Sequence, residues 1–428
     1  MMVRKYVSLF LALVIMAAGG CAPVPSTLSA DVVKSSEPRN TEVSVPPEDV
    51  DALVAANGEF AFDLYRHLAS DGENLFYSPH SISVALAMTY AGARGETEQA
   101  MGEAMNRTLS QDRLHPAFNY LDMELSSRGE GAEGKDDEGF RLNVVNAIWG
   151  QKGYSFLSDY LDTLAVNYGA GLRVLDFEQA PEESRVVIND WVEEQTEDRI
   201  QDLIPQGAID ALTRLVLTNA VYFNAAWESQ FEERDTNDGD FHLLDGNVVE
   251  VPMMKQTAWF RHADYEDYAA IELPYDGGEL SMVVLMPDEG KFEEFEESLD
   301  FSVVQTAIDG LSGSRVVLTM PRFGMETSFN LKDALSTLGM GTAFEPDAAD
   351  FSGMDGTQDL YITDVVHKAF VEVDEAGTEA AAATAVVVGA TSAPTEPVEF
   401  TIDRPFVFLI RDIQTGSILF LGRVVNPG

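Results

Sequence analysis

Few residues of this chain are spaced for catalysis or for holding a metal ion. No two of its six histidines form a metal-binding pair at helical spacing: His67, His80, His115, His242, His262 and His367. The single cysteine, Cys21, excludes an internal disulfide and a metal site made of several thiolates. The chain also contains no G-x-S-x-G, S-x-x-K, phosphate-loop or dinucleotide-binding motif. We therefore predict a protein that is not an enzyme and that needs no metal ion or cofactor.

One acidic segment has a spacing close to that of a calcium-binding loop. Residues 235–240 read Asp-Thr-Asn-Asp-Gly-Asp. The glycine comes one residue too early for such a loop, however, and no glutamate closes it. The segment is therefore predicted to be an exposed turn.

The composition limits the class of partner. The chain has 428 residues, 45% of them hydrophobic, so it can bury a large core. Lys and Arg number 27 against 72 Asp and Glu, which gives a formal net charge of −45. Nucleic acids and anionic membrane surfaces bind basic proteins. The acidity therefore excludes both as the main partner.

The first twenty residues have the features of a secretory signal. Arg4 and Lys5 precede an uncharged run, residues 7–20, which is shorter than the roughly 20 apolar residues that span a bilayer. The run ends in small residues directly before Cys21, which resembles a bacterial lipobox. We predict cleavage after residue 20, lipidation of Cys21 and a location outside the cytoplasm, either secreted or anchored to the outer face of the cell envelope. The alternative is an ordinary cleaved signal followed by an incidental cysteine.

The next segment, residues 21–48, is predicted to be a tether. Residues 22–48 contain five Pro, five Ser and two Thr, and they have no helical or alternating apolar pattern. Such a composition is typical of linkers. Fully extended, this segment would span about 90 Å at roughly 3.3 Å per residue. A single folded domain is predicted to follow, over residues 49–428.

The folded part begins with helices and ends with strands. Apolar residues recur at helical spacing over residues 50–68, and Ser78-Pro79 provides the cap of a second helix. After residue 214 the pattern is typical of strands separated by turns, with one further helix that Gly339 ends. This order predicts an α+β fold, with helices packed on large, mostly antiparallel sheets.

One late segment, residues 377–394, has an unusual composition. Its side chains are very small at first and β-branched later, with almost no charge after Glu379. Alanine favours helices, but the segment has no large apolar residue to bury and it joins two strand-like stretches. As a strand it would place four small side chains on one face, those of Thr378, Ala380, Ala382 and Thr384. These fit a packed interface without overfilling it, and Gly377 would give the backbone freedom to fold over. We predict two states, an exposed loop and an inserted strand.

Several separate motifs follow one another through residues 50–427. They are residues 74–82 and 92–97, residues 218–231, Pro321-Arg322-Phe323, Leu338-Gly339-Met340, residues 349–354, His367-Lys368-Ala369, residues 375–379 and residues 400–410. In this order and spacing they resemble the serpins, the serine protease inhibitor family. The resemblance covers essentially the whole folded part.

The resemblance implies both a fold and an activity. The serpin fold is α+β, with a large, mostly antiparallel central sheet, further sheets, about eight to nine helices and an exposed reactive-centre loop at about residues 375–398. The implied activity is that of a suicide substrate of serine endopeptidases. The protease cleaves the loop and forms an acyl-enzyme, and insertion of the cut loop into the central sheet then inactivates it. The implied partner is a serine protease in a covalent acyl complex, or a cysteine protease, and the inhibitor is expected to be a monomer.

The resemblance also assigns roles by position. The hinge of the loop matches Glu375, Gly377, Thr378, Glu379, Ala380, Ala381, Ala382 and Ala383. The family's shutter, a hydrogen-bonded cluster beneath the strands that part, matches Ser78, Ser81, Asn219 and His367. The breach, where insertion begins, matches Trp227. Without the resemblance these residues would be a helix cap, satisfied buried polar groups and a packed aromatic side chain.

The family's spacing after the hinge glutamate predicts that the protease cuts the bond between Thr391 and Ser392. Ala390 or Ser392 is equally compatible as the residue before the cut bond. A small residue there suits the shallow pocket of elastase- or subtilisin-like proteases rather than trypsin-like ones.

Two other interpretations of the whole protein stay open. One is a serpin-fold binding or carrier protein that does not inhibit, and the other is a secreted hydrolase with an unrecognised site.

Overall fold

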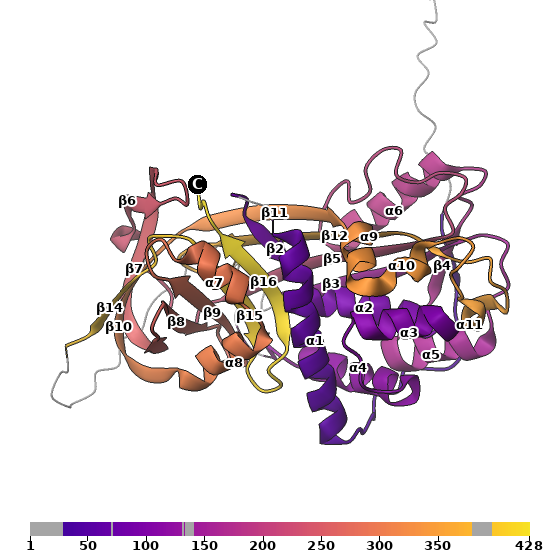
Figure 1. Cartoon of the computed structure of the whole chain (residues 1–428), viewed down its shortest axis with the longest axis horizontal. Coiled ribbons are helices and arrows are strands. Elements are labelled where there is room, and N and C mark those ends of the chain that lie inside the picture. Colours follow the sequence, from indigo (N-terminus) through magenta and orange to yellow (C-terminus); the bar gives the residue numbers. More distant parts are fainter. Residues whose placement is uncertain (1–28, 70–71, 131, 133–140, 379–395) are drawn as a thin grey trace, which may run out of the picture.

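Two twisted β-sheets organise the computed structural model, which describes residues 29–428 except 70–71, 131, 133–140 and 379–395 (Figure 1). Within this part of the chain, seven strands form the central sheet, in the order β1 (Asp31–Val33), β4 (Leu172–Leu175), β3 (Arg141–Gln151), β5 (Leu215–Ala226), β13 (Gly377–Thr378), β12 (Ile362–Val373) and β11 (Phe323–Asn330). The second sheet has the order β14 (Val398–Thr401), β10 (Ser312–Pro321), β7 (Val248–Asp264), β8 (Tyr268–Pro274), β9 (Leu280–Pro287), β15 (Phe406–Asp412), β16 (Ile418–Val424) and β2 (Leu75–Tyr77), with β6 (Asn237–His242) paired on β7.

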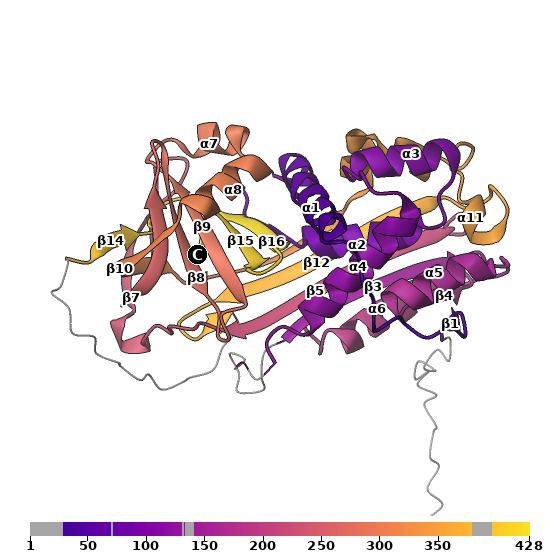
Figure 2. The same ribbon diagram turned by 90° about the horizontal axis from the view of Figure 1, so that it is seen from below.

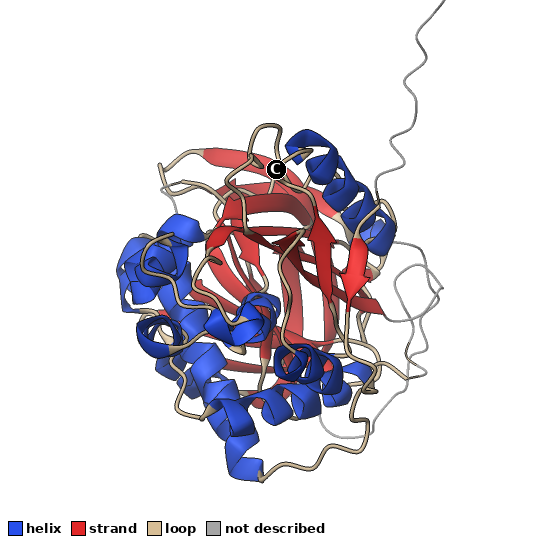
Figure 3. Ribbon diagram, turned by 90° about the vertical axis from the view of Figure 1, so that its right-hand side faces the viewer, coloured by secondary structure: helices blue, strands red, loops and turns tan. Residues whose placement is uncertain are grey.

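The helices gather mainly on one side of the central sheet (Figure 3). They are α1 (Pro47–Leu68), α2 (Pro79–Tyr90), α3 (Gly95–Ala104), α4 (Gln111–Ser126), α5 (Ser158–Tyr168), α6 (Pro181–Gln195), α7 (Phe292–Ser298), α8 (Phe301–Gly310), α9 (Lys332–Leu335), α10 (Gly341–Phe344) and α11 (Ser352–Asp355). None of the helices in the described part is long and apolar enough to cross a bilayer.

Alternate residues of β5 serve two separate cores. Leu215 and Leu217 belong to the main core that also includes α1 and α2, whereas Val216 and Ala220 belong to a smaller core with Ile188 of α6. Because successive side chains of a strand point to opposite faces, α6 covers the face of the central sheet opposite α2. Both faces of β5 are therefore buried, and all twelve of its residues are classed as buried.

Two neighbouring strands of the central sheet are joined at one end and separated at the other. β5 and β12 pair in parallel up to Ala369 opposite Val221. Beyond that point β13 lies between them, and Thr378 pairs with Ala225 of β5 on one side and Val373 of β12 on the other. The sheet therefore contains a short two-residue strand between β5 and β12, the two long strands that run through the middle of Figure 2.

The predicted α+β class and the two early helices are confirmed. Ser78 caps α2, and its hydroxyl accepts the backbone N–H of Ser81. The predicted end of a helix at Gly339 is also confirmed: its φ of 112° is not helical and separates the helical turns that begin with α9 from α10. One local prediction is wrong. Residues 237–242 are not a turn but β6, because pairing with β7 stabilises them as a strand.

The predicted tether is wrong for its second half. β1 pairs antiparallel with β4 at the edge of the central sheet. Further on, the guanidinium of Arg39 donates to Asn119 at 2.9 Å and forms an ion pair with Asp122 at 2.5 Å, both on α4. Pairing with an edge strand needs only backbone groups, so the apolar pattern of these residues did not reveal it. The segment from residue 31 onward is part of the domain.

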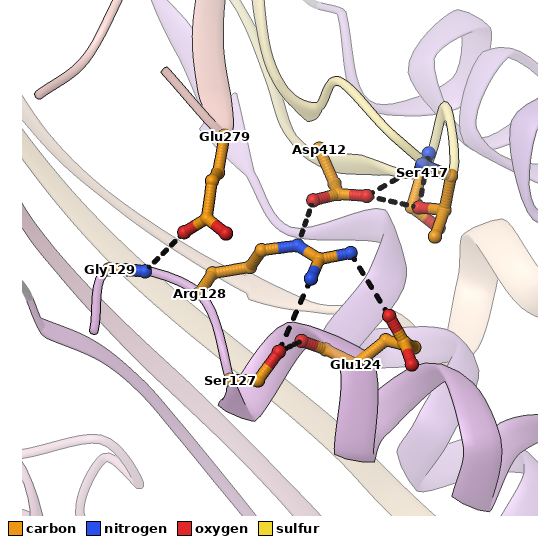
Figure 4. Close-up of polar contacts among 8 residues, drawn as sticks. Glu124, Ser127, Arg128, Gly129, Glu279, Asp412 and Ser417 are labelled. Carbon is orange, nitrogen blue, oxygen red and sulfur yellow. Dashed lines mark hydrogen bonds and ion pairs between the residues drawn. The ribbon is translucent and has the colours of Figure 1, made fainter. Parts of the chain in front are cut away.

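A buried ion pair fixes the end of α4 to the second sheet (Figure 4). Arg128 Nε donates to Asp412 Oδ1 at 2.7 Å, and the two side chains are 5% and 0% exposed. Arg128 also donates to Glu124 at 3.4 Å, and the next residue, Gly129, donates its N–H to Glu279 at 2.7 Å. Since the charges are shielded from water, either partner would be costly to leave alone.

Candidate functional site

The predicted shutter residues come together beneath the central sheet, where β5 and β12 are still paired. Asn219 of β5 and His367 of β12 are partners in the register of the two strands. Their side chains, each 0% exposed, form a hydrogen bond between His367 Nδ1 and Asn219 Oδ1. This bond crosses directly between the two strands that a new strand would have to separate.

Helix α2 supplies the other two predicted shutter residues. The backbone N–H of Ser78 donates to His367 Nε2 at 3.2 Å, and the Ser78 hydroxyl donates to the carbonyl of Leu419 on β16 at 2.7 Å. The Ser81 hydroxyl accepts a hydrogen bond from the Asn219 amide. The cluster therefore joins the two strands to the N-terminus of α2 and to the second sheet.

Asn146 of β3 completes the cluster, and the sequence analysis missed it. Its Oδ1 accepts hydrogen bonds from the Asn219 amide and from the Ser81 hydroxyl, the latter at 3.1 Å. Asn146 is one of two asparagines in β3, the other being Asn143, and nothing in the sequence distinguishes them. Such a residue looks solvent-facing until the neighbouring strand is placed.

His367 is held neutral in this cluster. Since the Ser78 backbone can only donate, Nε2 of the imidazole must accept, and the ring proton then lies on Nδ1, which donates to Asn219. Burial lowers the pKa of His367 to about 3, because no carboxylate compensates the desolvation of an imidazolium there. Both ring nitrogens are thus used at neutral pH.

The predicted breach residue holds the start of the hinge. Trp227 stacks on Tyr275 with ring centroids 4.6 Å apart, and its indole N–H donates to the carbonyl of Asp374 at 3.0 Å. Tyr275, which the sequence analysis did not identify, shares a hydrogen bond of 2.9 Å between its hydroxyl and that of Thr378. The side chain of Thr378 therefore points into the main core.

Gly377 is required for space rather than for the flexibility that the sequence analysis assigned to it. A Cβ atom at this position would lie 2.1 Å from the carbonyl oxygen of Ala225 and 2.8 Å from Cα of Ala226. Only glycine allows the backbone to pack so closely against β5. Gly377 and Thr378 are both paired in β13.

Glu375, the predicted hinge glutamate, is held by an ion pair. Arg322 donates from Nη2 and Nε to Glu375 Oε1 at 2.6 and 2.8 Å, and the Thr236 hydroxyl donates to the same oxygen. Burial by itself would raise the pKa of Glu375, but the hydrogen bonds from Arg322 and Thr236 keep it below its ordinary value. The carboxylate therefore stays charged. Because Arg322 directly follows the last residue of β10, the ion pair ties the chain before the predicted hinge to the end of that strand. The two donors come from segments far from the hinge in sequence, so a hinge motif gives no indication of them.

Several predicted site residues lie outside the described part of the chain. These are the hinge residues Glu379, Ala380, Ala381, Ala382 and Ala383, the candidate reactive-bond residues Ala390, Thr391 and Ser392, and Cys21. Among the residues that are described, no three His, Cys, Asp or Glu side chains are placed to hold a metal ion.

The comparisons with known proteins agree with this architecture. The family model described as Serpin (serine protease inhibitor) matches residues 55–427. An uncharacterized serpin-like protein of Thermococcus kodakarensis is 40% identical over 99% of both chains, and leukocyte elastase inhibitor A of Rattus norvegicus is 40% identical over 88% of this chain and 100% of its own. The native-state structure of tengpin, a thermophilic serpin, has a TM-score of 0.80 at 28% identity and covers 93% of this chain and 100% of its own. These similarities confirm the predicted fold, and the chain belongs to the serpin family.

Proposed function

We propose that this protein is an inhibitory serpin that acts as a suicide substrate of elastase- or subtilisin-like serine endopeptidases. It would work as a monomeric inhibitor rather than as an enzyme, with a cysteine protease as a second class of target. The small residues at positions 390–392 and the name of the elastase inhibitor from Rattus norvegicus support this choice of target. The observation that carries the proposal is the partly inserted strand β13 between β5 and β12.

The register of β13 defines what full insertion would look like. Thr378 pairs with Ala225, and each further residue of the loop would move one position back along β5. Val388 would then lie opposite Leu215, the first residue of β5. The candidate bonds at residues 390–392 follow directly after this end of the sheet. A protease attached there would be carried the full length of β5, about 35 Å at roughly 3.3 Å per residue.

The same register brings a hydroxyl group to the shutter. If the pairing of Thr378 with Ala225 continues in register, Thr384 lies opposite Asn219 of β5. If the pairing of Thr378 with Val373 continues likewise, Thr384 lies opposite His367 of β12. Thr384 lies six residues after Thr378, so both side chains would point into the main core. The inserted strand would break the His367–Asn219 hydrogen bond, and the Thr384 hydroxyl can donate to Asn219 and accept from His367 in its place.

Incubation with pancreatic elastase and with subtilisin tests the proposal. An inhibitory serpin gives a covalent complex that survives boiling in detergent, and a cleaved form that melts at a higher temperature than the intact protein. Cleavage without a complex but with higher thermal stability would assign the protein to the non-inhibitory carrier class. Cleavage with neither effect would overturn loop insertion altogether.

We also propose that Cys21 is lipidated and that the domain is displayed outside the cell. Since β1 begins at Asp31, only residues 22–30 would separate the anchor from the domain, and they span about 30 Å at most. The domain would then be held near the surface, with the β1 edge of the central sheet toward it. Mass spectrometry of the mature amino terminus tests this: a diacylated Cys21 supports an anchor, and an unmodified terminus overturns it.

A further inference from the structure

An exposed tryptophan stands in the second sheet. Trp259 of β7 is 72% exposed, more than the other large apolar side chains in the described part of the molecule. The next residue, Phe260, is 4% exposed and packs into the main core, so the strand turns Trp259 to the outer face. An indole that is exposed to water does not gain the free energy of burying its large apolar surface.

The register of the sheet relates Trp259 to the reactive-centre loop. Trp259 is opposite Arg315 on β10, and the next residue, Val316, is opposite Val398 on β14. β14 is the strand through which the chain returns to the fold after the loop. With neighbouring strands about 4.8 Å apart, Trp259 lies about 10 Å from the line of β14. Figure 2 shows these three strands at the end of the molecule where β14 begins.

Basic side chains outnumber acidic ones around Trp259, although the chain carries a formal net charge of −45. Arg315 beside it and Lys255, four residues before it on β7, are both exposed, and the exposed Glu399 of β14, opposite Val317, is the acidic neighbour. The adjacent Arg261 forms an ion pair with Glu272. An aromatic side chain with arginine next to it is the composition found most often at the energetic centres of protein–protein interfaces.

We propose that Trp259, Arg315 and Lys255, here called the contact patch, bind the body of the protease while it attacks the loop. The inference rests on the proposed function.

The candidate bonds lie within reach of the contact patch. Residues 390–392 precede Val398 by six to eight residues, a distance of about 26 Å at most when the chain is extended. A protease of roughly 220 residues has a radius of about 20 Å. A protease seated on the bond can therefore reach the contact patch. The patch suits an apolar surface edged by carboxylates next to the protease active site.

Three variants test the contact patch: Trp259→Ala, Arg315→Ala and the control Leu212→Ala. Leu212 is also strongly exposed, at 66%, but it precedes Leu215, at the end of β5 farthest from β13. The second-order rate constant of inhibition of elastase and subtilisin is measured at low and high salt, together with the stoichiometry of inhibition and the melting temperature of each variant.

We expect Trp259→Ala to slow inhibition about tenfold by at least one of these proteases, and Arg315→Ala to slow it severalfold with a weaker salt dependence. The stoichiometry and the melting temperature should stay as in the wild type, and Leu212→Ala should change nothing. Equal rates for Trp259→Ala and wild type would overturn the contact patch and leave the proposed function standing. If the proteases cleave the wild type without being inhibited, kcat/KM for loop cleavage is measured instead of the rate of inhibition. The same comparison of Trp259→Ala with the wild type then tests the contact patch.

Discussion

Replacing Thr384 by Ala tests whether the loop enters the sheet in the register of β13. In the intact protein His367 and Asn219 bond to each other, so they need nothing from residue 384. After insertion the two side chains are separated by the new strand. Without the Thr384 hydroxyl, the Asn219 carbonyl oxygen and the His367 Nδ1–H would both stay buried without a partner.

The size of the effect follows from these two groups. A buried polar group without a partner costs about 1–3 kcal/mol, so with two such groups the inserted form should lose about 2–6 kcal/mol in total. For a protein of roughly 400 residues the entropy of unfolding is about 0.8 kcal/mol per kelvin. The cleaved Thr384→Ala protein should therefore melt about 3–7 °C below the cleaved wild type, whereas the two intact proteins should melt at the same temperature.

Differential scanning calorimetry of intact and loop-cleaved samples measures both values. The control is Thr395→Ala, which makes the same change beyond the candidate bonds, in a part of the loop that would not be inserted. Its cleaved form should melt like the cleaved wild type. If the cleaved Thr384→Ala protein also melts like the wild type, the loop does not insert in the register of β13. The stoichiometry of inhibition gives a second measure, since slower insertion lets more inhibitor be consumed as substrate.

Three further predictions concern the stability of the intact protein. Arg128→Ala should lower the free energy of unfolding in denaturant titrations by about 3–5 kcal/mol, because it leaves Asp412 charged and buried. The free energy of unfolding should also fall between pH 6.5 and pH 5, by up to about 1.4 kcal/mol per pH unit for each of His80, His115 and His367. Burial holds the pKa of these groups at about 4, 4 and 3, so the unfolded chain binds protons that the folded protein does not. Deleting residues 22–40 should lower the melting temperature by about 2–5 °C, because β1 and the Arg39 contacts are worth roughly 2–4 kcal/mol.

Each of these predictions has a control. Glu124→Ala, at the partly exposed end of the Arg128 network, should cost less than about 1 kcal/mol. His115→Gln should reduce the pH slope by about a third, whereas the exposed His67 can be replaced without effect. Deleting residues 22–28 alone should leave the melting temperature unchanged. Equal effects of a variant and its control would contradict the corresponding argument.

Local patterns in the sequence were enough to predict most helices and strands and the positions of the motifs. The apolar period of α1, the Ser78 cap of α2 and the small side chains after Gly377 are each properties of a few neighbouring residues. The order of helices and strands was enough for the α+β class. The errors all involve contacts between distant segments. β6 and β1 are strands only because β7 and β4 pair with them.

The candidate site shows the same division. The residue types of the predicted shutter and hinge, and the formal net charge of −45, were determined by the sequence alone. That Asn219 is bonded to His367, that Asn146, Tyr275 and Arg322 belong to the site, and that Thr378 is already in the sheet were decided only by the tertiary structure. The physical reason is that a buried polar group needs a partner, and that partner can lie far away along the chain. A local pattern shows that a partner is needed, and only the folded register shows which residue it is.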